Sequence, residues 1–206
     1  MDFEGAKAFI IRELRRELNP LYSYHCLGHT LDVHTAAQKL IEMEGIPEKE
    51  AKFIEVAALY HDSGMILRYE DHETASAELA SRFLPDFGFS KKDIGMINSL
   101  IMVTRLPQKA SALNEQIMCD ADLDYLGRDD FFIHSFELQN EWNVCGIRKT
   151  NLSEWLEIQI RFLGEHQYFT KSAALLRNRK KSDNLFEITS LWQQKNQKKP
   201  STATSS

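Results

Sequence analysis

Glycine and proline are scarce in this chain. The sequence has nine glycines and five prolines among 206 residues, about 7 %, whereas these two types make up roughly 12 % of average protein sequence. Sandwiches and barrels of β-strands need many tight turns, and such turns draw heavily on both residues. In addition, no segment shows a convincing alternation of apolar and polar side chains. The sequence therefore predicts an all-α fold, a single-domain helical bundle.

Apolar residues recur at helical spacing along most of the chain, and the interruptions coincide with helix-stopping residues. Asn19-Pro20 ends the first predicted helix, because the residue before a proline avoids the helical region. No Ser/Gly linker or shift in composition divides the chain, so we assign residues 1–196 to one domain. The small, polar and basic residues 197–206 are predicted to be a disordered tail. The predicted helices span residues 2–18, 27–44, 48–61, 72–83, 91–104, 114–126, 130–145, 151–167, 170–180 and 184–194.

The composition argues against several classes of protein. A net charge of −5 is not typical of a protein that binds polymeric nucleic acid, since such proteins are normally basic. No stretch approaches the ~20 apolar residues that span a membrane. Cys26, Cys119 and Cys145 are an odd, widely spaced set, which is unsuited to a disulfide framework. The N-terminal residues are acidic where a signal peptide is basic. We therefore expect a cytoplasmic protein with inert thiols and no membrane partner.

Two histidines and an aspartate fall on the apolar faces of predicted helices. His29 shares the apolar stripe that continues to Leu40, eleven residues later. His61 follows Ile54 by seven positions on the buried side of the next helix, and Asp62 adjoins it. A buried carboxylate is costly unless it is paired or holds a metal. Two interpretations remain open, namely a metal centre, or satisfied core histidines with Asp62 capping a turn.

Three further acids interrupt the otherwise apolar segment 117–127. Asp124 can be explained as a solvated surface residue. Asp120 and Asp122, however, lie roughly 200° apart around a helix, so at least one of them should face the core. There only a cation or a strong hydrogen-bond donor stabilises a carboxylate.

Taken in order, these segments resemble the HD-domain metal-dependent phosphohydrolases. The resemblance is carried by TyrHisCysLeuGlyHisThr at 24–30, HisAsp at 61–62 and AspAlaAsp at 120–122, which follow the family's ordered His…His-Asp…Asp signature. HisGluThrAlaSerAla at 72–77 also fits, and the resemblance covers residues 20 to 185. It implies a bundle of the HD-domain type and a metal-dependent enzyme.

The resemblance also implies roles for individual residues. Asp120 is the alternative to Asp122 as the last metal ligand. His25 matches a histidine that is proposed to protonate the leaving oxygen in cyclic-nucleotide-cleaving relatives, and Asp62 can both bind the metal and orient the attacking water. His72 matches a histidine that some relatives use for a second metal or for the substrate phosphate. The metal ligands implied are His29, His61, Asp62 and Asp122.

Such a site suits the hydrolysis of a phosphoester. Mixed imidazole and carboxylate ligands suit Mn, Fe, Co, Ni or Zn and also admit Mg, and we favour manganese. A bound ion lowers the pKa of water from 15.7 toward about 7 and holds a phosphoryl oxygen. We expect a metal-dependent phosphohydrolase with a small phosphorylated or nucleotide-like substrate. The alternative is a catalytically weak, ligand-sensing or regulatory module. Monoester or diester specificity stays open, as does the oligomeric state, with a homodimer among the options.

Other residues offer weaker signals. We take His72, Arg105 and Arg128 as candidate substrate contacts, although each arginine also fits an ordinary solvated position at a helix end. His34 is expected to be exposed, since five residues after His29 it is turned about 140° away. Trp142 is expected to pack between helices, with a wall against a nucleobase as the alternative.

Overall fold

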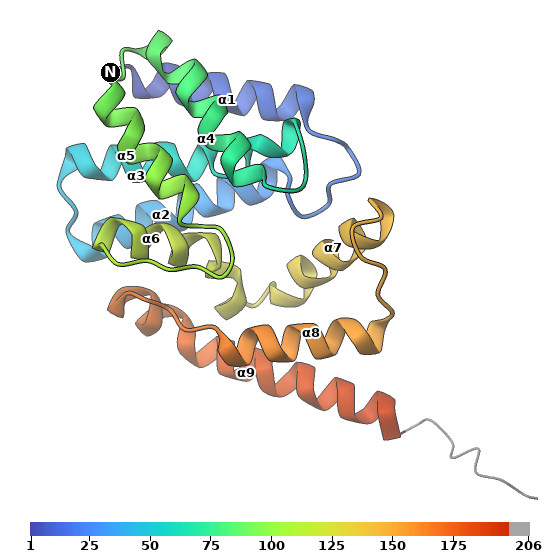
Figure 1. Ribbon diagram of the computed structural model, residues 1–206. Coiled ribbons are helices and arrows are strands. Elements are labelled where there is room, and N and C mark those ends of the chain that lie inside the picture. Colours follow the sequence, from blue (N-terminus) through green and yellow to red (C-terminus); the bar gives the residue numbers. More distant parts are fainter. Residues whose placement is uncertain (198–206) are drawn as a thin grey trace, which may run out of the picture.

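The computed structural model describes residues 1–197, which form an all-α bundle as predicted (Figure 1). Three short 3₁₀ helices, η1 (Ser63–Ile66), η2 (Leu84–Phe87) and η3 (Asp124–Gly127), lie between the α-helices. The predicted disordered tail, residues 197–206, lies outside the described residues except for Gln197, which is the last residue of α9. The α-helices of the described range are α1 (Phe3–Glu17), α2 (Leu27–Glu44), α3 (Glu48–Tyr60), α4 (His72–Phe83), α5 (Lys91–Met102), α6 (Leu113–Asp122), α7 (Phe131–Val144), α8 (Leu152–Glu165) and α9 (Lys171–Gln197).

Two predicted helix boundaries were wrong. The helices expected at residues 170–180 and 184–194 are one continuous helix, α9, because no helix breaker stands among residues 181–183. The helix expected at 114–126 ends at Asp122, where Leu123 leaves helical geometry with φ −105° and ψ 18°, and continues as η3. This second difference places Asp122 at a helix end rather than within a helix.

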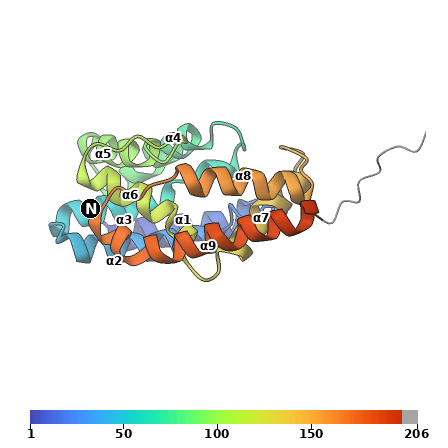
Figure 2. The ribbon, with the colours of Figure 1, turned by 90° about the horizontal axis from the view of Figure 1, so that it is seen from below.

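Buried apolar side chains form two clusters. The first surrounds α3 and includes residues from α1, α2, α5 and α6, with Ile54, Ala57 and Ala58 at its centre. The second joins η3 and α7 to α8 and α9, which lie side by side in both ribbon views (Figure 2). Ala121 belongs to the first cluster and Leu123 to the second, so Asp122 stands where the two meet. Within residues 1–197, no helix combines the length and apolar character that a membrane span requires.

Gly64 allows η1 to lie directly against α4. Its backbone N–H donates to Ser76 Oγ at 2.7 Å. A Cβ at this position would stand 2.0 Å from the carbonyl oxygen of His72 and 2.6 Å from the backbone nitrogen of Ser76. Only glycine tolerates such an approach of one backbone to another. The contact brings His72, the first residue of α4, next to Asp62.

Candidate metal centre

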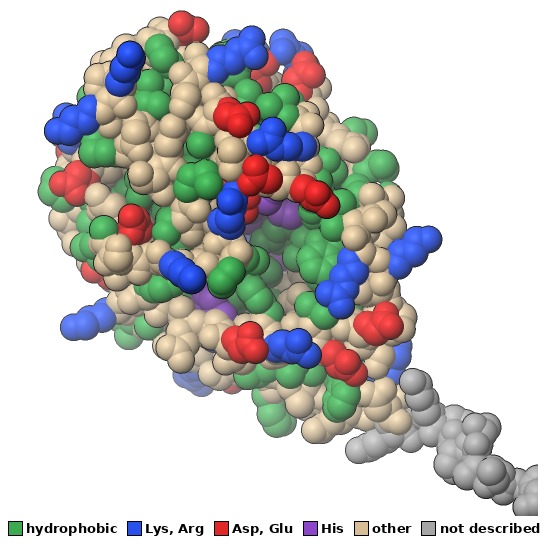
Figure 3. Space-filling model, in the orientation of Figure 1, with side chains coloured by type: hydrophobic (Ala, Val, Ile, Leu, Met, Phe, Trp, Pro, Cys, Tyr) green, Lys and Arg blue, Asp and Glu red, His purple; other side chains and the backbone are tan. Residues whose placement is uncertain are grey.

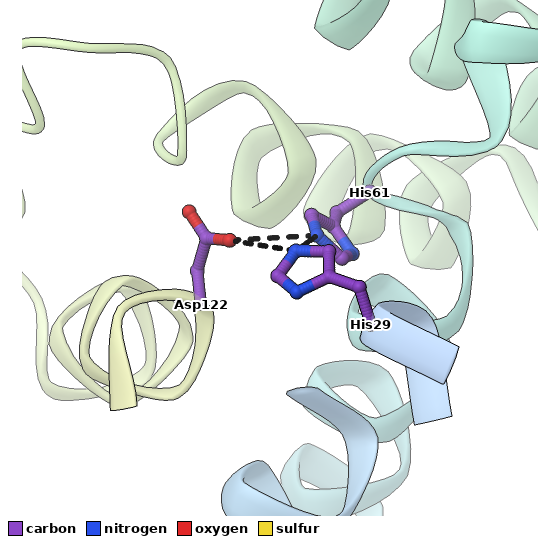
Figure 4. Close-up of side chains that lie close together, drawn as sticks. All are labelled: His29, His61 and Asp122. Carbon is purple, nitrogen blue, oxygen red and sulfur yellow. Dashed lines mark hydrogen bonds and ion pairs between the residues drawn. The ribbon is translucent and has the colours of Figure 1, made fainter. Parts of the chain in front are cut away.

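The four predicted metal ligands come together from three separate parts of the chain. His29 lies in the first turn of α2, His61 caps the C-terminus of α3, Asp62 follows it, and Asp122 is the last residue of α6. Figure 4 shows the Asp122 carboxylate directed toward the imidazoles of His29 and His61, which face it from the other side.

The ligand atoms of His29, His61 and Asp122 all lie within 4.8 Å of one another, and Asp62 lies beside the two imidazoles. His29 Nε2 and His61 Nε2 are 3.4 Å apart, and Asp122 Oδ1 lies 3.5 Å from each of them. Asp62 Oδ2 lies 3.4 Å from His29 Nε2 and 3.2 Å from His61 Nε2. Ligand atoms about 2.0–2.2 Å from a common ion stand roughly 3.0–3.5 Å from one another. The residues present therefore fit a divalent ion of the first transition row.

Surrounding groups hold these ligands in orientation. His61 Nδ1 donates to the carbonyl oxygen of Ala58 at 2.8 Å, so the lone pair of its Nε2 faces the centre. Gln108 Nε2 donates to Asp122 Oδ2 at 3.1 Å, which leaves Oδ1 for the imidazoles. The Tyr24 ring lies beside the His29 ring, with their centroids 4.6 Å apart. Such supporting contacts are typical of preorganised metal sites.

The carboxylates of the centre raise the pKa values of both its imidazoles. Burial alone would lower the pKa of His61, but the adjacent carboxylates of Asp62 and Asp122 outweigh burial and raise this pKa well above its usual value. The pKa of His29 is raised by the same two carboxylates against the effect of its own burial. Burial would likewise raise the pKa of Asp62, yet His61 and His29 lower it well below its ordinary range.

Metal binding is therefore expected to release protons. A metal ligand must be a neutral imidazole, so the ion competes with protons that the carboxylates have stabilised. We expect the apparent affinity for Mn²⁺ to rise with pH across neutrality. Calorimetric titrations at pH 7 in two buffers of different ionisation enthalpy measure the number of protons released. Equal heats in both buffers would contradict the assignment.

The three acids of segment 117–127 have three different partners. Asp120 points away from the centre, where it accepts hydrogen bonds from Phe169 N at 2.8 Å, Thr170 N at 2.8 Å and Thr170 Oγ1 at 2.7 Å. Asp124 is buried and binds Arg177 through both oxygens, at 2.7 and 2.9 Å, so the interpretation of Asp124 as a solvated residue was wrong. The alternative that Asp120 is the last ligand does not fit this arrangement, whereas Asp122 does.

His25 stands beside the centre and is held by a carboxylate that the sequence analysis did not identify. Its Nδ1 contacts Oε1 of Glu141, a fully buried residue of α7. The other oxygen of Glu141 accepts the backbone N–H groups of Tyr24 and His25 at 2.9 Å each. Tyr69 Oη donates to Oε1 at 2.9 Å. Burial would raise the pKa of Glu141, but the contacts with His25 lower it. The His25 ring is thereby fixed, with Nε2 as its remaining nitrogen.

A cavity of about 250 Å³ opens onto these residues, and Figure 3 shows its mouth as a hollow with histidine inside. His25, His29, Asp62 and Asp122 all line it. His72 lines it too, with Nε2 3.3 Å from Asp62 Oδ1. Burial would lower the pKa of His72, but Asp62 raises it to about 9.

The two arginines predicted to contact substrate are both engaged elsewhere. Arg105 binds Asp71 and lies 3.5 Å from Glu73, a residue that does line the cavity. Arg128 is bound by Asp130 and by Asp32 at 3.1 Å, and it lines a separate depression of about 740 Å³ on the surface. Neither arginine lines the cavity: Arg105 lies next to it through Glu73, and Arg128 borders a separate small cleft beside His29 and Asp122.

Two other expectations differ from the structure. His34 is only 4 % exposed, because α3 packs over it and brings Glu55 Oε2 to 3.4 Å from its Nε2, so the expected exposure was wrong. Trp142 packs edge-on against Trp155, with ring centroids 5.2 Å apart, and also lines the cavity.

Comparisons with known proteins agree with this geometry. The sequence matches the HD domain family over residues 26–123, a range that contains all four ligands. A predicted HD superfamily hydrolase from an uncultured Thermotogales bacterium has 21 % identity and a TM-score of 0.59, over 93 % of this chain and 89 % of that one. The Lin1889 protein from Listeria innocua has 19 % identity and a TM-score of 0.64, over 93 % and 96 % of the two chains.

At these identities the two structures show a shared fold. No curated protein matches the sequence. The match shows an HD domain over residues 26–123 of this chain, and the two solved structures share the fold of the chain.

Proposed function

We propose that the protein is a metal-dependent phosphohydrolase that cleaves a phosphoester bond of a small phosphorylated substrate. One observation carries the proposal, which is that His29, Asp62 and Asp122, three members of the metal centre, line the same cavity as His25 and His72. A purely structural metal site is closed by its protein ligands, whereas a catalytic one keeps a position open toward substrate. The opening of this centre onto a cavity supports the catalytic alternative.

Each residue of the centre has a separate role in the proposed hydrolysis. A divalent ion bound by His29, His61, Asp62 and Asp122 would lower the pKa of water and neutralise phosphoryl charge. His72 lines the cavity beside the centre and would donate a hydrogen bond to the phosphoryl oxygens. Asp62 orients the attacking water.

The proton balance rests on His25. The water oxygen bonds to phosphorus while the ester P–O bond breaks, and the proton that the water loses passes to solvent, from which His25 is later reprotonated. His25 gives its Nε2 proton to the departing oxygen. Glu141 keeps the ring in place through Nδ1 during this transfer.

Hydrolysis of simple aryl esters tests the proposal. 4-Nitrophenyl phosphate and bis(4-nitrophenyl) phosphate report monoesterase and diesterase activity, and phenyl phosphate adds a poorer leaving group. We expect turnover of at least one ester that disappears with a chelator and returns with Mn²⁺. A protein that binds Mn²⁺ and hydrolyses none of the three would be a ligand-sensing module instead.

Replacing His25 with alanine is expected to spare the metal and slow the reaction. Loss of a general acid typically costs 10²–10⁴-fold in rate. The loss should be larger for phenyl phosphate than for 4-nitrophenyl phosphate, because nitrophenolate departs readily without a proton. Metal content and the rates for both esters measure the effect. An equal loss of metal in His25→Ala and His61→Ala would show that His25 is a ligand.

A further inference from the structure

One wall of the cavity is built by helices that lie outside the HD domain. Leu138 and Trp142 come from α7, and Ile158, Gln159 and Phe162 come from α8. Four of these five side chains are apolar or aromatic. Trp155 stiffens the wall from behind, since it is fully buried and its Nε1–H donates to Ser135 Oγ at 3.0 Å.

Gln159 is the exception in this wall. It is only 3 % exposed, and its Oε1 accepts no hydrogen bond from any residue in the range 1–197. Buried polar atoms in folded proteins are almost always paired, so an unpaired one calls for a specific explanation. Three other buried side-chain atoms in that range also lack partners, but their residues do not line the cavity. A ligand in the cavity is the natural partner of Gln159.

The charge of the cavity limits what this ligand is. Among the described residues that line it, none is lysine or arginine, and its charged groups are histidines and carboxylates. A single phosphoryl group can be neutralised at the metal centre. Further phosphates, as in a polyphosphate chain, would find no lysine or arginine among these lining residues and would lie near acids such as Glu73.

We propose that the wall formed by α7 and α8 holds the leaving group of the substrate, and that Gln159 accepts a hydrogen bond from it. The leaving group is accordingly flat, uncharged and largely apolar, and it carries one N–H or O–H donor. This inference rests on the proposed function, because it assigns a leaving group to the same cavity.

Two isosteric esters test the inference. Indol-5-yl phosphate has a ring N–H that benzofuran-5-yl phosphate replaces with an oxygen, while size and planarity are unchanged. We expect kcat/KM to favour the indolyl ester by about threefold to tenfold, the range of one neutral hydrogen bond. Gln159→Met should bring this ratio close to one. Gln193→Met, the same change on an exposed part of α9, should leave it unchanged.

A binding measurement separates this inference from the proposed function. Calorimetry with 5-hydroxyindole and 5-hydroxybenzofuran needs no turnover, and it should show the same preference in the wild type and its loss in Gln159→Met. Equal binding of both alcohols by the wild type, or an unchanged preference in Gln159→Met, would overturn the role of Gln159 even if the esters are hydrolysed. Preferential binding of 5-hydroxyindole without hydrolysis of any ester would refute the proposed phosphohydrolase activity. It would still support a ligand site at the wall formed by α7 and α8.

Discussion

Asp122→Asn is expected to abolish metal binding and to reduce hydrolysis to the metal-free background. The substitution keeps the size of the side chain but removes the negative charge that lies 3.5 Å from both imidazoles. An amide oxygen is a weaker ligand, and the other ligands cannot move to replace it because His61 is held by Ala58 and Asp62 contacts His72. The fold itself should remain, since Gln108 can still bond to the asparagine.

Thermal unfolding with and without Mn²⁺ measures this loss without relying on activity. A ligand that binds only the folded protein stabilises it by about 2.7 kcal/mol at a concentration 100 times its Kd. We expect the wild type to show the corresponding rise in Tm and Asp122→Asn to show none. Asp129→Asn is the matched control, because that side chain is 96 % exposed and its one ion pair among the described residues is with Lys180. A Tm shift retained in Asp122→Asn would mean that another carboxylate completes the centre.

Much of the metal centre could be predicted because helical periodicity determines which side chains face the core. His29 and His61 each lie on an apolar stripe, and the structure brings their Nε2 atoms to 3.4 Å. The choice between Asp120 and Asp122 was harder, because both carboxylates are directed inward. The group that distinguishes them, the start of α9, lies some 50 residues further along the chain.

The cavity wall could not be predicted either, because its burial also depends on contacts between residues that are far apart in the sequence. Glu141 and Gln159 are polar residues on α7 and α8, and the sequence alone does not show that either is buried. Their burial follows from how α7 and α8 pack against the HD domain, and the backbone partners of Glu141 lie more than 100 residues away. Local sequence patterns do not predict contacts between residues so far apart. A glutamate adjoining Trp142 in a mostly apolar helix was the available signal.

Asp120→Ala is expected to have the opposite effect to Asp122→Asn, with a large loss of stability and little change in metal affinity. The variant removes the carboxylate that accepts hydrogen bonds from the backbone N–H groups of Phe169 and Thr170 and from the Thr170 hydroxyl. These three donors lie at the start of α9, within 2.8 Å of the carboxylate. Buried donors left unpaired cost about 1–3 kcal/mol each. Burial raises the pKa of Asp120 despite these bonds, so the buried charge itself has a cost that offsets part of the loss.

We therefore expect the free energy of unfolding to fall by about 2–4 kcal/mol, a substantial share of the roughly 5–15 kcal/mol that stabilises a typical domain. Urea unfolding of the metal-free wild type and of both variants measures this difference. Because Asp120 and Asp122 are two residues apart on one helix, general damage to α6 would affect both properties in both variants. If only Asp120→Ala loses stability and only Asp122→Asn loses metal, then Asp120 holds the start of α9 and Asp122 is the metal ligand. The reverse result would exchange their roles.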